Sequence, residues 1–162
     1  MGIIDPILRE FDAEMPATRR LLERVPDAKL EWKPHAKSKT LKELAVHIAE
    51  LPRWGLRIGQ STWAVGSEKA PPLSSAAEVL ARFDENAAAC RAAIAGKTDE
   101  ELKERITVTR AGAEFFTLPK ISVLRRVLLN HLIHHRGQLT VYLRLHDVPL
   151  PSVYGPTADE DI

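Results

Sequence analysis

Two histidines lie one helical turn apart in the middle of a leucine-rich segment. His131 and His135 fall between Leu128 and Leu139, and residues at i and i+4 stack on one face of an α-helix. A core-facing imidazole is costly to bury unless its ring nitrogens find partners. Two stacked imidazoles can each aim one nitrogen at a single ion. The spacing therefore predicts a metal site in the protein interior, with two ordinary core histidines as the alternative.

His47 is the third candidate ligand, at the edge of the apolar face of an earlier predicted helix. Metal sites in helical proteins are built from inward side chains on facing helices. Three neutral imidazoles without a carboxylate leave coordination positions for water or substrate, which is the catalytic rather than the structural pattern. Zinc and nickel are the preferred divalent ions, with iron and manganese as alternatives. Position 132 is Leu, so the H-E-x-x-H motif of zincin metalloproteases is absent.

Residues that could support the metal site are selected only by their spacing from the three histidines along the sequence. Side chains on the same helices are expected to orient the imidazoles, and the candidates are Glu43, Glu50 and Gln138. His134 is the nearest candidate for a general base, with a boundary residue at the surface as the alternative, so we assign no catalytic residue. Asp159 and Glu160 either reach the mouth of the site or belong to a solvated tail. Four aromatic residues have two possible roles: they line a pocket, or they pack against the helices or in a dimer contact. They are Trp54, Trp63, Phe115 and Phe116.

Helical periodicity predicts four long helices. They run from about Ile3 to Val25, from Thr40 to the region of Pro52, from Ser75 to Ile94, and from Pro119 to His146. Thr40 with Glu43, and Ser75 with Glu78, have the spacing of capping boxes. Pro52 lacks a backbone donor and is expected to kink or end the second helix.

The segments between these helices are predicted to be loops and a small hairpin. Gly59–Leu73 is rich in Gly, Ser and Pro and predicts a long crossover loop. Arg105–Phe116 has two β-prone pieces around Ala111–Gly112, typical of a hairpin. The predicted fold class is all-α: one domain over residues 1–162, a four-helix bundle with a long crossover and room for a small β-hairpin.

The composition argues against several classes of protein. Lys and Arg number 23 and Asp and Glu 22, whereas nucleic-acid binders usually carry a basic excess on one face. The apolar stretches are shorter than the roughly 20 residues that span a bilayer. The N-terminal residues lack the pattern of a signal peptide, and Cys90 is the single cysteine. We expect a cytoplasmic protein that binds neither nucleic acid nor membrane.

Four pieces of the sequence resemble the DinB-like superfamily, which includes damage-inducible proteins and the YfiT-type metal-dependent hydrolases. They are EWKP at 31–34, LAVHIAEL around His47, NHLIHHRGQLTVYLR around His131 and His135, and the tail VPLPSVYGPTADE. The resemblance covers nearly the whole chain. It implies a four-helix bundle, a divalent metal ion held by His47, His131 and His135, and a homodimer. Pro52 departs from the pattern expected of the family.

The resemblance also implies a function. Some DinB-like proteins are thiol transferases that use low-molecular-weight thiols such as bacillithiol, mycothiol or glutathione, and one branch isomerises maleylpyruvate. The expected function is that of a metal-dependent thiol transferase or hydrolase that acts on a small electrophilic substrate. The alternative is a non-catalytic metal-binding stress-response or interaction protein, in which the ion joins two helices.

Overall fold

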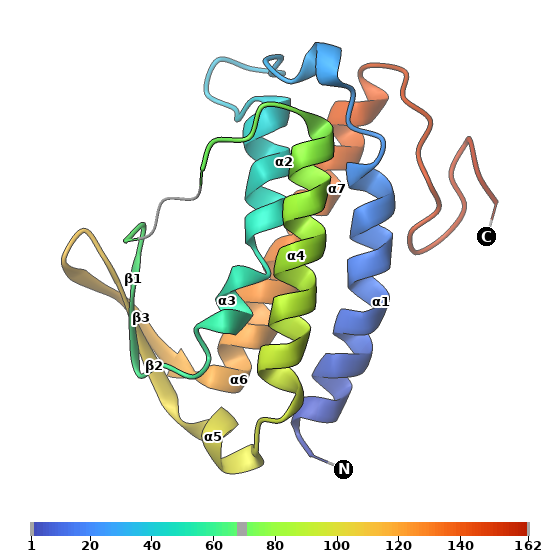
Figure 1. The fold of residues 1–162 in the computed structure, drawn as a ribbon. Helices are drawn as coiled ribbons and strands as arrows, with labels where there is room; N and C mark the ends of the chain where they lie inside the picture. Colours follow the sequence, from blue (N-terminus) through green and yellow to red (C-terminus); the bar gives the residue numbers. More distant parts are fainter. Residues whose placement is uncertain (1, 68–70, 162) are drawn as a thin grey trace.

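The computed structural model describes residues 2–67 and 71–161. Four long helices lie side by side (Figure 1), and packing contacts join α1 to α4 and α7, and α2 to α4 and α7. Apolar side chains that are almost completely buried form the core between them, among them Leu21, Leu44, Ile48, Phe83, Ile94 and Leu139. The long helices are α1 (Ile4–Leu22), α2 (Leu41–Glu50), α4 (Ala76–Ala95) and α7 (Asn130–Arg144). Among the described residues, none of the helices combines the length and the apolar character needed to span a bilayer.

The predicted capping boxes form at the starts of α2 and α4. Thr40 Oγ1 accepts a hydrogen bond from the Glu43 backbone N–H at 3.1 Å, and Glu43 Oε2 accepts one from the Thr40 N–H at 2.8 Å. Ser75 and Glu78 make the same pair of bonds. Helix α2 ends at Glu50, just before Pro52, and a short helix α3 (Arg53–Leu56) follows. The break that Pro52 predicts is confirmed, and it lets α3 pack against α4.

A three-stranded sheet lies beside the helices (Figure 1) and overturns the predicted all-α four-helix bundle. Strand β1 (Thr62–Val65) runs parallel to β2 (Arg105–Arg110), which pairs antiparallel with β3 (Ala113–Pro119). The fold is therefore mixed α/β. The hairpin β2–β3 forms where its sequence predicts it, but β1 lies in the predicted crossover Gly59–Leu73, of which residues 68–70 lie outside the described residues. Its partner is distant in sequence, and parallel strands need such a long connection, so local pattern cannot reveal the pair.

The last helical segment is less regular than its sequence predicts. It comprises α6 (Lys120–Ser122), the π-helical turn η2 (Val123–Leu129) and α7, and it ends at Arg144. The leucines of this segment form one buried stripe, in which Leu124, Leu128, Leu132, Leu139 and Leu143 are at most 1% exposed. Two short helices complete the fold, the 3₁₀ turn η1 (Asp27–Lys29) and α5 (Asp99–Lys103).

Candidate metal centre

Helix α2 places His47 at the boundary between core and pocket. Leu44, Ile48 and Leu51 are buried, and these residues fix the face of α2 that packs against the other helices. His47 lies beside that face and is half-buried. The capping box at Thr40 and the helix end before Pro52 bracket the helix on either side. The backbone that carries His47 is therefore held at both ends.

Helix α7 presents His131 and His135 to α2. The two residues are one turn apart, and both are half-buried next to the fully buried Leu132 and Leu139. The π-helical turn η2 directly precedes them and widens the helix by using i→i+5 hydrogen bonds. Such turns recur at functional sites. The sequence pattern gave no sign of this turn.

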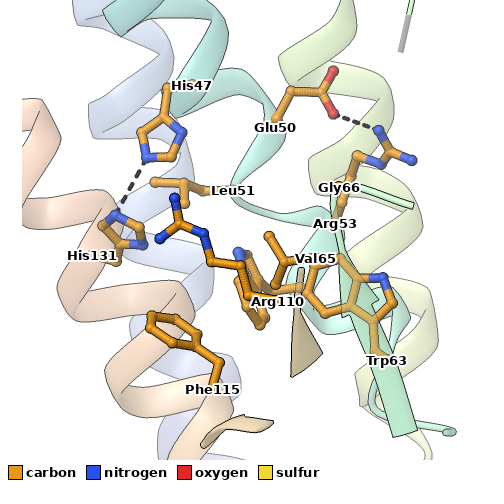
Figure 2. Close-up of a pocket in the computed structure, with 11 residues that line it drawn as sticks. His47, Glu50, Leu51, Arg53, Trp63, Val65, Gly66, Arg110, Phe115 and His131 are labelled. Atoms are coloured by element: carbon orange, nitrogen blue, oxygen red, sulfur yellow. Dashed lines mark hydrogen bonds and ion pairs between the residues drawn. The ribbon is translucent and has the colours of Figure 1, made fainter. Parts of the chain in front are cut away.

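The three imidazoles converge on one point. His131 Nε2 lies 3.3 Å from His47 Nε2, a contact drawn in Figure 2, and 2.8 Å from His135 Nε2. One ligand atom of each residue lies within 4.8 Å of the others. Two nitrogens that bind one zinc ion at about 2.0–2.1 Å in tetrahedral geometry lie roughly 3.3 Å apart. The structure thus brings together the three histidines selected from the sequence, with a spacing that could hold a metal ion.

The outer partners of two rings determine which nitrogen faces the centre of the group. Nδ1 of His135 lies 2.7 Å from Gln138 Oε1, which accepts its proton. A hydrogen bond from His131 to the Val127 backbone engages the second ring in the same way. The Nε2 atoms of both rings are then lone-pair acceptors only 2.8 Å apart. Two facing lone pairs repel one another unless a cation lies between them, so the donor set fits a metal ion.

Burial keeps all three imidazoles neutral at physiological pH. It is the main cause that lowers the pKa of His47 to about 4, and the neighbouring His135 and His131 lower it further. Burial also lowers the pKa of His131 and of His135, against the opposing effect of their hydrogen bonds to Val127 and Gln138. A neutral imidazole is the form that binds a metal.

Of the three residues proposed to orient the imidazoles, only Gln138 contacts one of them. Glu43 closes the capping box of α2 instead. Glu50 accepts hydrogen bonds from Arg53 at 2.8 Å and from Arg82 at 2.7 Å. The capping box of Glu43 follows from its spacing to Thr40, whereas the role of Glu50 could not be read from spacing because an arginine of another helix, Arg82, bonds to it.

The weaker candidates lie away from the imidazole group. The exposed ring of His134 has its centroid 4.9 Å from that of His135, and His134 is not part of the converging group. Asp159 pairs with Arg144 and Glu160 with Arg20, which ties the tail to the helices. The tail carboxylates are therefore structural partners of arginines.

A cavity of about 580 Å³ adjoins the candidate metal centre and includes His47 and His131 in its wall. Figure 2 shows His47 and His131 at the left with Phe115 below them, and Val65 and Trp63 of strand β1 toward the right. Trp54, Trp63 and Phe115 line it, as one of the two sequence interpretations expected, whereas Phe116 stacks on Trp54 at 6.2 Å. The remaining lining residues are Glu50, Leu51, Arg53, Val65, Gly66 and Arg110. Sequence reasoning missed Arg110, which lies in β2 and is paired with Val65 of β1, another residue of the cavity wall.

Fold and site together define a helix-rich protein with three converging imidazoles beside a ligand-sized cavity. The sequence matches the DinB family over residues 4–161. The chain therefore belongs to the DinB family, as the sequence pieces around the histidines predicted.

Relatives of known sequence or structure agree with this assignment. The chain is 28% identical over 158 residues to the uncharacterized protein YrdA of Bacillus subtilis, covering 97% of this chain and 91% of that protein. A DinB-like protein from Bacillus subtilis superposes with a TM-score of 0.72 at 20% identity, over 92% of this chain and 97% of that one. A DinB-like protein from Bacillus cereus gives 0.71 at 25% identity, over 93% and 97%. A DinB family protein from Exiguobacterium sibiricum gives 0.67 at 21% identity, over 91% and 93%.

Proposed function

We propose that this protein is a metal-dependent enzyme, a thiol transferase or a hydrolase, that acts on a small electrophilic substrate. In this proposal His47, His131 and His135 hold one divalent ion, zinc or nickel, with iron and manganese as alternatives. One observation carries the proposal: three imidazoles with ligand atoms within 4.8 Å of one another stand at the wall of a cavity of about 580 Å³. The low-molecular-weight thiol cosubstrate rests on the resemblance to DinB-like proteins that transfer such thiols.

The composition of the donor group supports a reactive site over a purely structural one. Among the described residues, no further His, Cys, Asp or Glu joins the three histidines. Structural zinc sites are closed by four protein ligands, whereas catalytic sites keep a position open for water or substrate. The adjoining cavity gives a substrate access to that open position.

A divalent ion at this site supplies Lewis-acid chemistry, lowering the pKa of a thiol or a water molecule so that it becomes a nucleophile at neutral pH. The protein's own residues orient and shield the reaction. Gln138 and the Val127 backbone hold the rings of His135 and His131 with their Nε2 atoms toward the site. Trp54 and Trp63 line the cavity, and apolar surface of this kind disfavours water and strengthens electrostatic interactions beside it.

The test is a conjugation assay. Metal-loaded protein is incubated with monochlorobimane and bacillithiol, mycothiol or glutathione. We expect His131→Ala to abolish conjugation and His134→Ala, the exposed neighbour outside the group, to retain it, with both variants folded by circular dichroism. Unchanged conjugation in His131→Ala would contradict the proposal. A metal-loaded wild type with no conjugation and no hydrolysis of electrophiles would favour the non-catalytic metal-binding protein instead.

We further propose a homodimer in the cytoplasm. Val141 on α7 and Leu145, the residue that follows its last turn, are 58% and 57% exposed and four positions apart. Neighbouring exposed apolar side chains are typical of a surface that another protein chain covers. The lone, buried Cys90 fits a reducing compartment. Light scattering coupled to gel filtration tests the dimer, and a monomeric mass would contradict it.

A further inference from the structure

Within residues 2–67 and 71–161, one cation in the cavity wall has no acidic partner. Arg110 lines the cavity, and its guanidinium carbon lies 5.8 Å from the centroid of the Phe115 ring. Among the residues that the structure describes, no carboxylate pairs with it. Figure 2 shows the side chain reaching into the cavity on the side of His131 and His47. A guanidinium in this position is ready to receive an anion from solution.

The β-sheet fixes the backbone position of Arg110. Arg110 is the last residue of β2, and its backbone is paired with Val65 of β1 on one side and Ala113 of β3 on the other. The tight turn after it has positive φ at both Ala111 and Gly112, 51° and 82°, as two-residue type I′ hairpin loops require. The central strand of a sheet thus carries Arg110, and binding sites on such elements are more rigid than sites on loops.

The charges in the cavity wall favour an anionic ligand. Glu50 is the one acidic lining residue of the described chain, and it is already bonded to Arg53 and Arg82. In the described part of the chain, the wall therefore has one neutralised carboxylate, that of Glu50, and one guanidinium without a carboxylate partner, that of Arg110. Arg binds carboxylates through two parallel N–H donors, which makes it selective for planar anions.

Apart from Arg53 and the two histidines, the rest of the wall is mainly apolar and aromatic. Trp54 and Trp63 meet edge to face with their ring centroids 4.3 Å apart. Leu51 and Val65 add aliphatic surface, and Phe115 is 56% exposed next to Arg110. Ligand sites are commonly apolar with a few polar groups that fix orientation. This cavity has both parts.

We propose that the cavity binds a small amphipathic carboxylate, whose anionic group pairs with Arg110 and whose apolar body lies against Trp54, Trp63 and Phe115. The inference deepens the proposed function and rests on it for the orientation of the ligand, whose reactive end would face His47 and His131. Arg110 is then the residue that selects acids over neutral substrates of the same shape.

The test compares an acid with its neutral amide by calorimetry. The probes are naphthylacetate and naphthylacetamide, titrated into chelator-treated and into nickel-loaded protein. We expect wild type to prefer the acid roughly tenfold or more, because hydrogen bonds to charged groups are the stronger ones. Arg110→Gln should remove the preference, and Arg110→Lys, which keeps the charge but loses the two parallel donors, should keep only part of it. Arg105→Gln is the matched control, since Arg105 lies at the other end of the same strand.

Three results would overturn the inference. They are equal binding of acid and amide by wild type, an acid preference that survives Arg110→Gln, and no binding of either probe at millimolar concentrations. A preference that appears only with nickel and survives Arg110→Gln would place the carboxylate at the histidines instead. Nickel content, measured on every variant, reports separately on the proposed function. Absence of nickel binding together with an Arg110-dependent acid preference would contradict the proposed function but still support the anion site.

Discussion

Gly55 sits where helix α3 touches helix α4, and an added methyl group there should destabilise the protein. A Cβ atom on Gly55 would overlap Sγ of Cys90 and would also approach Leu128 Cδ1 to 3.4 Å. Cys90 is completely buried, and side chains in a helix have few alternative χ1 rotamers. Relief therefore requires α3 to move away from α4, taking Trp54 in the cavity wall with it.

The net effect of Gly55→Ala is a difference between two terms. Overpacking a filled core costs about 1–3 kcal/mol, and replacing glycine by alanine inside a helix returns up to about 1 kcal/mol. We expect a net loss of about 1–2 kcal/mol in the free energy of unfolding. Because the clash is with one sulfur atom, Cys90→Ala should relieve it, with a coupling energy of about 1–2 kcal/mol in the double variant.

Urea unfolding followed by circular dichroism measures these differences as shifts of the transition midpoint. Gly59→Ala is the control, because nothing lies within 4 Å of the added Cβ, and surface changes of this kind are usually within about 0.5 kcal/mol. Wild-type stability in Gly55→Ala, or strictly additive effects of Gly55→Ala and Cys90→Ala, would refute the packing argument.

Three further outcomes follow from the same structure. Ala111 has a φ of 51°, a conformation that asparagine tolerates better, so Ala111→Asn should raise the free energy of unfolding by about 0.5–1 kcal/mol; a lower urea midpoint would contradict this. Burial raises the pKa of Cys90 to about 12, so its thiolate is disfavoured at neutral pH. Ellman's reagent should therefore react with Cys90 only after unfolding in urea. Rapid reaction with the folded protein would contradict the buried position of Cys90. Gln138→Leu removes the partner of His135 Nδ1, and by calorimetry nickel affinity should fall roughly 10–100-fold; an unchanged affinity would show that the ring needs no such support.

Local sequence patterns were sufficient to predict most of the helical part. Thr40 with Glu43, and Ser75 with Glu78, fix helix starts through bonds between residues three apart. The leucine stripe from Leu124 to Leu143 depends only on helical periodicity. The pair His131 and His135 could be placed on one helix face for the same reason.

The parts that could not be predicted depend on contacts between distant segments. Thr62 pairs with Thr107, although helices α4 and α5 separate the two residues in the sequence. Strand β1 is short, and the Gly and Ser residues around it favour a loop more strongly than its own residues favour a strand. Arg110 is paired with Val65 in that same register, and both residues line the cavity. Glu50 could not be assigned from spacing, because Arg82 on another helix determines its role.

The most direct test of the metal centre is elemental analysis of protein purified after exposure to nickel or zinc. His47 is the critical residue, since it comes from a different helix than His131 and His135 and contributes only if α2 and α7 meet as described. We expect about one ion per chain in wild type and in His134→Ala, and almost none in His47→Ala. Equal metal content in wild type and His47→Ala, or a wild type that binds none, would contradict the three-histidine site.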